Sequence, residues 1–278
     1  MTNRTSFPFI KLQAGANDFI LMEKDKIAPF HENLPEFARR CCRRRFSVGA
    51  DGLLLMEASS KARVKMTLFN EDGSPAALSG NGVRCLAYYF LFFKGEKSPL
   101  AIETDAGIIT AMEKEGEIQI SVPPPATLRI NHVLTIDDDE ITGHYIDVGV
   151  PCFCLPSEDV DREDVVSLGK AIRSHPDFPE GVNVVFFSTT GPRHLKLRTY
   201  ERGVDQETLS CGVGSLAAAL TAAETAGIPA PVFCRNRSGE TQTVLFKQVQ
   251  GGFREVCLKG PVSCVYEGHL HIVTNDFL

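Results

Sequence analysis

Residues 70–85 read NEDGSPAALSGNGVRC, and residues 201–214 read ERGVDQETLSCGVG. Each stretch carries a small nucleophilic side chain, Ser79 or Cys211, directly before Gly-x-Gly, and an apolar, helix-forming segment follows. A glycine turn that leads into a helix presents unpaired backbone N–H groups and a partial positive charge. The sequence therefore predicts two helix starts that can bind an anion, one beside a hydroxyl and the other beside a thiol.

The two stretches fall in register when the chain is shifted by 132 places. This shift lays Ser79 on Cys211, Gly82 on Gly214, Thr67 on Thr199 and Leu54 on Phe186. Alternating apolar residues precede both stretches, as in strands. Such a repeat predicts two similar domains. We expect them at 1–122 and 123–264, divided by three prolines that cannot continue a sheet, with a strand at about 265–278 returning to the first domain.

Composition narrows the class of protein. The net charge of −6 and the pI of 5.7 argue against nucleic acid or a membrane surface as the main partner. The basic cluster at 39–45 is interpreted as a solvated helix face, with a polyanion site as the alternative. The nine cysteines form no C-x-x-C pair, which favours buried free thiols over zinc or disulfides. With no apolar run of spanning length and no signal core, we expect a cytoplasmic protein.

Several short motifs occur together in a defined order. They are Gly-x-Asn-Asp-Phe at 15–19, Gly-Ala-Asp-Gly at 49–52, Asn-x-Asp-Gly-Ser at 70–74, Gly-Asn-Gly-x-Arg-Cys at 80–85, Gly-Val-Asn-Val at 181–184, Tyr-Glu-Arg-Gly at 200–203, Cys-Gly-x-Gly at 211–214 and Gly-Pro at 260–261. Together they resemble diaminopimelate epimerase across nearly the whole chain. The resemblance implies an α+β fold of two similar domains, each a β-barrel-like sheet wrapped around a central helix, with the active site in the cleft between them.

The resemblance also implies an isomerase that interconverts L,L- and meso-diaminopimelate without pyridoxal phosphate or metal, in lysine and peptidoglycan-precursor synthesis. One thiolate removes the α-proton and a thiol on the opposite face returns a proton. Fixed dipoles at two helix starts suit such chemistry, because the α-proton is very weakly acidic. A thiol pKa lowered by a helix end would supply the base. A small amino acid is the expected partner, and the sequence leaves a homodimer open.

Carried over by position, the resemblance assigns roles to individual residues. Cys211 and Ser79 take the two acid/base positions, and Glu201 tunes the thiols or receives the distant ammonium group. The substrate-binding set is Asn17, Asn70, Gly80, Asn81, Asn183, Glu201, Arg202, Gly212 and Val213. Arg202 is suited to a bidentate clamp on the distant carboxylate. The alternative for Cys211 is a packed small residue at a helix start, and for Asn70 it is turn capping alone.

The departures from the family pattern bear on activity. Ser79 stands where the family has its first catalytic cysteine, Gln13 stands where a histidine is common, and Val150 and Cys152 replace an Asn and a His of the motif Gly-Asn-Pro-His. Cys152 is therefore a candidate for tuning the thiol pKa in place of the imidazole. A serine hydroxyl is a poor base at neutral pH unless a neighbour removes its proton.

Three interpretations of Ser79 follow. It is an inactivating replacement, it acts as an acid or through water in a slow or altered isomerisation, or the chain has been diverted to another amino acid such as glutamate. The changes at Val150 and Cys152 favour natural divergence over a single substitution. A related isomerase or dehydratase on the same fold, or a non-catalytic amino-acid-binding homologue, are the alternatives from other classes.

Overall fold

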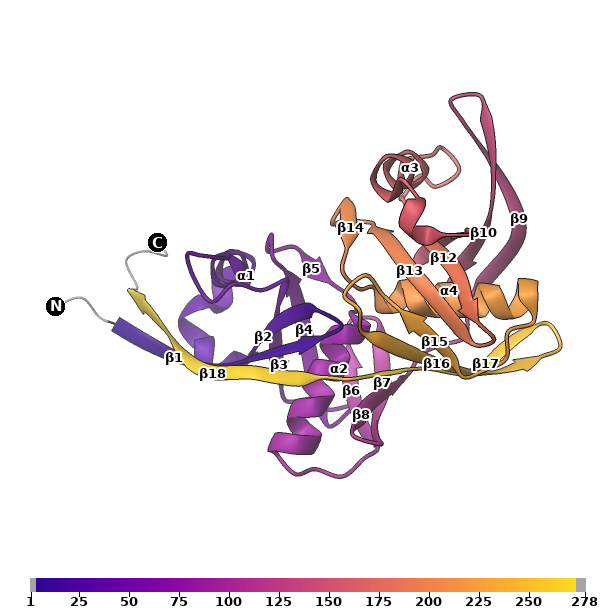
Figure 1. Cartoon of the computed structure of the whole chain (residues 1–278). Helices are drawn as coiled ribbons and strands as arrows, with labels where there is room; N and C mark the ends of the chain where they lie inside the picture. The colour runs from indigo at the N-terminus through magenta and orange to yellow at the C-terminus, as the bar shows by residue number, and fades with distance from the viewer. Residues whose placement is uncertain (1–3, 274–278) are drawn as a thin grey trace. The chain divides into compact units, whose positions relative to one another are not determined.

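The computed structural model describes residues 4–273, which divide into two compact units (Figure 1). Unit 1 runs to Ile120 and resumes at Pro261, and unit 2 is Ser121–Gly260. The C-terminal strand β18 (Ser263–Val273) belongs to unit 1, where it pairs antiparallel with β1 (Arg4–Ala14). The first unit is thus built from both ends of the described chain.

Unit 1 is a strongly mixed sheet. Its strand order is β18–β1–β2–β3–β4–β6–β7–β8, with the short β5 beside β4. Pairing is antiparallel except at β2–β3 and β4–β6, which are parallel. The bounds are β2 Asn17–Glu23, β3 Gly52–Glu57, β4 Val64–Asn70, β5 Pro75–Ala76, β6 Leu100–Thr104, β7 Gly107–Lys114 and β8 Glu117–Ser121.

Unit 2 repeats this arrangement with its own strands. The order is β9–β10–β11–β12–β13–β15–β16–β17, with β14 beside β13, and the parallel pairs β11–β12 and β13–β15 occupy the same places. The bounds are β9 Thr127–Ile136, β10 Asp139–Asp147, β11 Pro151–Pro156, β12 Asn183–Gly191, β13 His194–Glu201, β14 Gln206–Thr208, β15 Val232–Arg235, β16 Thr241–Val249 and β17 Gly252–Gly260. The shared topology confirms the predicted duplication.

A buried helix runs through each sheet. In unit 1, α2 (Gly80–Tyr88) contacts β1, β2, β3, β4, β6 and β7, and the π-helical turn η2 (Tyr89–Phe93) continues it. In unit 2, α4 (Gly212–Ala226) contacts all the strands from β10 to β17 except β14. α4 is apolar on nearly all sides, as expected for a helix enclosed by a sheet. The predicted α+β fold, with a barrel-like sheet around a central helix in each half, is confirmed.

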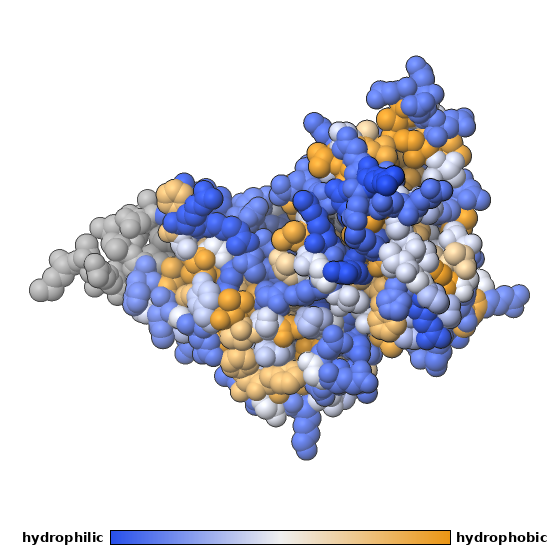
Figure 2. Space-filling view, in the orientation of Figure 1, coloured by the Kyte–Doolittle hydropathy of each residue, from blue (hydrophilic) through white to orange (hydrophobic). Residues whose placement is uncertain are grey.

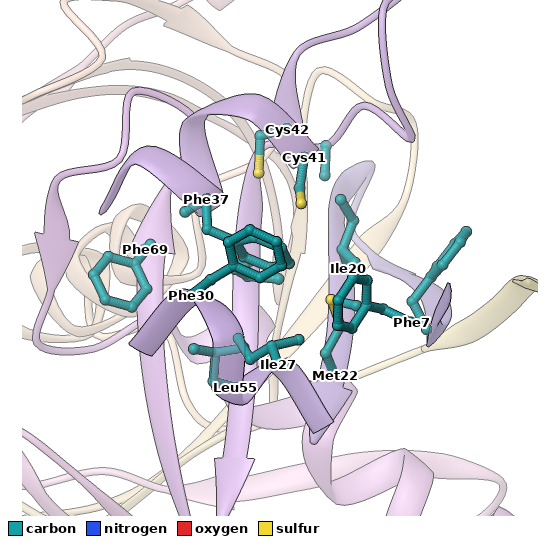
Figure 3. Close-up of a cluster of buried hydrophobic side chains, with 14 residues drawn as sticks. Phe7, Ile20, Met22, Ile27, Phe30, Phe37, Cys41, Cys42, Leu55 and Phe69 are labelled. Carbon is teal, nitrogen blue, oxygen red and sulfur yellow. The ribbon is translucent and has the colours of Figure 1, made fainter. Parts of the chain in front are cut away.

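Smaller helices cover the outside of each sheet. In unit 1, η1 (Lys24–Asn33) and α1 (Leu34–Cys42) pack on β1, β2 and β3 through the side chains shown in Figure 3, with Phe30 and Phe37 stacked at 5.0 Å. In unit 2, η3 (Val160–Arg162) and α3 (Val165–Arg173) pack on β12 and β13. α1 ends at Cys42, so the basic cluster at 39–45 lies on a helix only in its first part.

The repeat is not uniform along the chain. Leu54 pairs with Leu68 in unit 1, and Val185 pairs with Thr199 in unit 2. Leu54 lies against Gly82 as Val185 lies against Gly214, and the alternation of buried residues along β4 matches that along β13 at a shift of 131. The counterpart of Leu54 is therefore Val185 and that of Thr199 is Leu68, so the expected matches of Leu54 with Phe186 and of Thr67 with Thr199 are wrong. The shift becomes 132 at the helix starts, where Ser79 matches Cys211.

Unit 2 opens on β9. Asp137 and Asp138 form the β9–β10 turn with positive φ, and Asp139 begins β10. All nine cysteines are free thiols, as expected, although Cys257 and Cys264 are only partly buried. In the part of the chain that the structure describes, no helix is both long and apolar enough to cross a membrane.

The basic cluster at 39–45 is largely neutralised within unit 1. Arg39 and Arg40 both pair with Glu36, at 2.7 and 2.5 Å. Arg44 pairs with Asp18 and Asp51 at 2.5 and 2.7 Å, and Cys41 and Cys42 lie in the core. Figure 2 shows hydrophilic residues over most of the visible surface, with apolar residues scattered among them. The solvated-face interpretation of the cluster agrees with these contacts.

Candidate active site

Ser79 and Cys211 occupy the same local structure at the start of the two central helices. Each is the N-cap, with φ −137° and ψ 118° at Ser79 and φ −133° and ψ 112° at Cys211. The Ser79 Oγ accepts the N–H of Gly82 at 3.1 Å, and the Cys211 Sγ accepts the N–H of Gly214 at 3.3 Å. The predicted placement of a hydroxyl and a thiol at two equivalent helix starts is thus what the structure shows.

Glycine is required three residues after each cap because the capping side chain folds over it. A Cβ at Gly82 would lie 3.3 Å from the Ser79 Cβ, and one at Gly214 would lie 3.3 Å from the Cys211 Cβ. The Gly214 Cβ would also meet the Thr199 hydroxyl at 2.9 Å. The Gly-x-Gly pattern therefore serves the close approach of the nucleophile to the helix backbone.

The two nucleophiles differ in their surroundings. Cys211 is 5% exposed, whereas Ser79 is half-buried. Burial raises the pKa of the Cys211 thiol well above its usual value, and the negative charge of Glu201 raises it further. The N–H groups of Gly214 and Val213 lower the pKa, as expected of a helix start, but burial outweighs them. The expectation of a lowered thiol pKa is therefore wrong, because burial and Glu201 together outweigh the helix start.

A buried polar cluster supports the start of α4. The Asn236 Oδ1 accepts the Cys211 N–H at 3.5 Å, and its Nδ2 donates to the Ser215 Oγ at 3.2 Å. The Gln242 Nε2 donates to the Ser210 Oγ at 3.4 Å. Sequence reasoning missed these residues, because β15 and β16 bring Asn236 and Gln242 to the helix from far along the chain.

The residues expected to bind the distant end of a substrate meet where β13 turns into β14. The Arg202 N–H donates to the Asn183 Oδ1 at 2.8 Å, and the Arg202 Nη1 donates to the Glu180 carbonyl at 3.3 Å. The Thr208 hydroxyl holds one carboxylate oxygen of Glu201 at 3.0 Å. Asn183 thus orients the backbone of Arg202, a role that its type alone did not reveal.

Cys152 lies in the same part of unit 2. It is fully buried, its thiol donates to the Val150 carbonyl at 3.5 Å, and its pKa is raised well above the usual value by burial and then by Cys154 and Cys211. A hydrogen bond from Asn183 acts in the opposite direction. The structure therefore brings Cys152 close enough to Cys211 for a Cys211 thiolate to disfavour ionisation of Cys152.

In unit 1, a chain of side-chain hydrogen bonds links the expected site residues. The Arg84 Nη2 donates to the Asn81 Oδ1 at 2.7 Å, the Asn81 Nδ2 donates to the Asn17 Oδ1 at 3.4 Å, and the Asn17 Nδ2 donates to Asp51 at 2.7 Å. Since Arg84 can only donate and ionised Asp51 can only accept, the chain fixes the orientation of both amides. Asp51 and Arg84 belong to the motifs at 49–52 and 80–85, but the sequence did not reveal that they anchor the two ends of this series of hydrogen bonds.

Asn70 is the last residue of β4 and begins the turn that follows. Its Nδ2 donates to the Ser74 Oγ at 3.0 Å, and its carbonyl accepts the Gly73 N–H at 3.0 Å. Asp72 accepts both the backbone and the hydroxyl hydrogen of Ser74 at 2.8 and 2.6 Å. These bonds are those of a capped turn, so the alternative role for Asn70 is visible in the structure.

The expected site residues thus form one group in each unit. Unit 1 holds Asn17, Asn70, Ser79, Gly80 and Asn81, and unit 2 holds Cys152, Asn183, Glu201, Arg202, Cys211, Gly212 and Val213. Among residues 4–273, no group of three or more His, Cys, Asp or Glu side chains is arranged to hold a metal ion.

Known proteins resemble this chain over most of its length. The family profile described as "Diaminopimelate epimerase" matches residues 9–124 and 144–265. The diaminopimelate epimerase of Aquifex aeolicus is 38% identical over 275 residues, covering 94% of this chain and 97% of the relative. That of Archaeoglobus fulgidus is 34% identical over 286 residues, covering 95% and 96%.

Solved structures share the fold at much lower identity. A hydroxyproline epimerase from Agrobacterium vitis aligns with a TM-score of 0.72 at 15% identity, covering 96% of this chain and 93% of its own. A phenazine biosynthesis protein of the PhzF family from Bacillus anthracis gives 0.74 at 16%, covering 96% and 100%. These two likenesses bear on the fold alone. With the family profile and the full-length relatives, the chain belongs to the diaminopimelate epimerase family of isomerases.

Proposed function

We propose that this protein converts L,L-diaminopimelate to meso-diaminopimelate by two-sided proton transfer at the α-carbon. Cys211 is one acid/base, and Ser79 stands at the position of the other. The observation that carries the proposal is the identical capping geometry of these two side chains at equivalent helix starts. The named activity of the full-length relatives supports the choice of substrate. The reaction would serve lysine and peptidoglycan-precursor synthesis in the cytoplasm.

Cys211 supplies the proton that one face of the α-carbon receives. Its raised pKa keeps the thiol protonated, which suits an acid, and the N–H groups of Gly214 and Val213 stabilise the thiolate that remains after transfer. In the reverse direction the same thiolate takes the α-proton, so the C–H bond breaks as the S–H bond forms. Glu201, held by Thr208, is placed to receive the thiol proton when Cys211 must act as the base.

The helix starts and the polar side chains bind the substrate. Backbone N–H groups at Gly80–Asn81 and Gly212–Val213 hold the reacting carboxylate, where they also stabilise charge that develops at the α-carbon. Arg202 clamps the distant carboxylate. The amides that contact the substrate's ammonium and carboxylate groups are Asn17, Asn70 and Asn183.

Ser79 limits the rate of proton transfer at the other face of the α-carbon. Its hydroxyl has a much higher pKa than a thiol, so it returns or removes a proton slowly unless water relays the proton. The reaction therefore proceeds at a reduced rate, with Ser79 acting as a weak acid or a water-orienting group. In this proposal Cys152 takes the place of the family's histidine beside Cys211.

A second candidate is racemisation of another amino acid, such as glutamate. Val150 lacks the side-chain amide that the resemblance implies for binding substrate at this position. Without this amide the site discriminates less strongly in favour of a substrate with a second amino acid centre, because such discrimination depends on hydrogen-bonding groups.

The test is exchange of the α-hydrogen in deuterated water. The protein is incubated with L,L-diaminopimelate, with meso-diaminopimelate and with glutamate, and deuterium at the α-carbon is measured by mass spectrometry. The proposal expects deuterium in diaminopimelate and its loss in Cys211→Ala. Exchange in glutamate alone would favour the second candidate. Binding without exchange of any substrate would show an amino-acid-binding homologue instead.

A further inference from the structure

Thr199 is a buried hydroxyl with no hydrogen-bond partner in the described chain. It lies on β13 and is 3% exposed. Burying a hydroxyl without a partner costs free energy, and such a group in a folded protein calls for a physical explanation. The proposed mechanism gives Thr199 no task.

The hydroxyl is aimed at the first turn of α4. The Thr199 Oγ1 is the heavy atom nearest to the point that a Gly214 Cβ would occupy, at 2.9 Å, and the Cys211 Cβ is next at 3.3 Å. The Gly214 N–H donates to the Cys211 Sγ at 3.3 Å. Thr199 and Cys211 therefore both pack against Gly214, which has no side chain to separate them.

We infer that the Thr199 hydroxyl donates a hydrogen bond to the Cys211 sulfur when the thiol is ionised. A neutral thiol is a weak acceptor and gives the hydroxyl little reason to turn toward it. Ionisation makes the sulfur a strong acceptor, and a bond from a neutral donor to a charged acceptor is roughly twice as strong as one between neutral groups. Thr199 then acts as a positioning residue that stabilises the charged form of Cys211.

Glu201, on the same strand as Thr199, acts against the ionisation of Cys211 through its negative charge. Cys152 on β11 is a second buried thiol near the sulfur. Cys234 on β15 is buried and donates to the Ser215 carbonyl at 3.6 Å, so its thiol is already engaged. The backbone N–H groups at the start of α4 and the Thr199 hydroxyl are thus the donors that counter burial and Glu201.

The equivalent strand of unit 1 provides a control. Leu68, which pairs with Leu54 over Gly82, occupies the place of Thr199, so the half that carries Ser79 has an apolar side chain there. Thr67, the neighbouring residue on β4, donates its hydroxyl to the Glu57 Oε1 at 3.3 Å. Thr67→Val removes a threonine hydroxyl from this strand without touching Cys211.

The experiment measures the rate of Cys211 alkylation by iodoacetamide across pH, with the modified residue located by tandem mass spectrometry. Thr199→Val is nearly isosteric and should slow alkylation at pH 8 about tenfold, the effect of losing one hydrogen bond to a charged group. Thr199→Ser keeps the hydroxyl and should restore the wild-type rate, and Thr67→Val should leave it unchanged. Thermal unfolding of Thr199→Val should be unchanged or shifted upward, because an unpaired hydroxyl is removed.

Equal alkylation rates in wild type and Thr199→Val would overturn the inference. An equal slowing in Thr199→Ser would overturn it too, since packing rather than the hydroxyl would then be responsible. The inference takes its functional meaning from the proposed acid/base role of Cys211, but alkylation needs no substrate. Failure of the protein to exchange α-hydrogen would refute the proposed reaction. The alkylation rates would still decide whether the Thr199 hydroxyl stabilises the Cys211 thiolate.

Discussion

Ser79→Cys is the substitution that tests the limiting step most directly. Ser79 and Cys211 cap their helices in the same backbone conformation. At Cys211 this cap already accommodates a sulfur, which accepts a backbone N–H at 3.3 Å. Ser79 is half-buried, so the larger atom has room on its exposed side. We therefore expect Ser79→Cys to fold with its helix cap intact and to place a thiol at the second acid/base position.

The expected gain in kcat is large. A well-placed general acid or base contributes about 10²–10⁴-fold to rate, or about 3–5 kcal/mol of barrier, and a thiol regains this where the hydroxyl does not. Release of α-deuterium in wild type and Ser79→Cys, with [α-²H]-L,L-diaminopimelate as substrate, measures the gain. KM should change little, because the backbone N–H groups and Arg202 that bind the substrate are untouched.

Ser79→Ala separates the interpretations of the hydroxyl. If Ser79 acts as an acid or orients water, the alanine variant falls well below wild type. An alanine variant equal to wild type, with a cysteine variant no faster, would refute the assignment of this position to proton transfer. That outcome would mean that another group, not at the start of α2, completes the reaction.

Two further substitutions test the electrostatics of unit 2. Glu201→Gln removes a negative charge that raises the pKa of the Cys211 thiol, so its pKa should fall and iodoacetamide should alkylate it faster at a given pH; slower alkylation would contradict this sign. Glu207→Ala leaves Arg198, bound to Glu207 at 2.7 and 2.9 Å, without its buried partner, and should cost about 3 kcal/mol in urea unfolding. A loss below about 1 kcal/mol would show that solvent replaces the carboxylate.

Local sequence signals were enough to predict the framework of both halves. Gly-x-Gly directly after Ser79 and Cys211 is a local pattern, and the structure has both residues as helix caps. The repeat was visible because the two hairpins and the two helix starts have nearly the same spacing. The expected matches failed in the hairpin, where the offset is 131 rather than 132, because one more residue separates β13 from the start of α4 than separates β4 from the start of α2.

The properties of the site that depend on distant residues could not be predicted. The helix start argued for a lowered thiol pKa at Cys211, but the surrounding sheet buries the thiol and Glu201 adds its charge. Asn236 and Gln242 reach the α4 start only through β15 and β16. Burial and long-range pairing are set by tertiary structure, and no local pattern around residue 211 encodes them.

The two halves keep one backbone arrangement but surround their nucleophiles with different chemistry. At Cys211 the helix start rests on buried polar groups, with Asn236 and Ser215 bonded to each other beneath it. The residues 132 places earlier are Thr104, whose hydroxyl bonds to the Gly107 carbonyl, and the apolar Val83. In unit 1, polar side chains are instead joined in the series of hydrogen bonds from Arg84 through Asn81 to Asn17. The groups that surround residue 79 thus differ from those that surround Cys211. A thiol placed at 79 should therefore ionise at a different pH, and the pH profile of Ser79→Cys should show two separate thiol titrations.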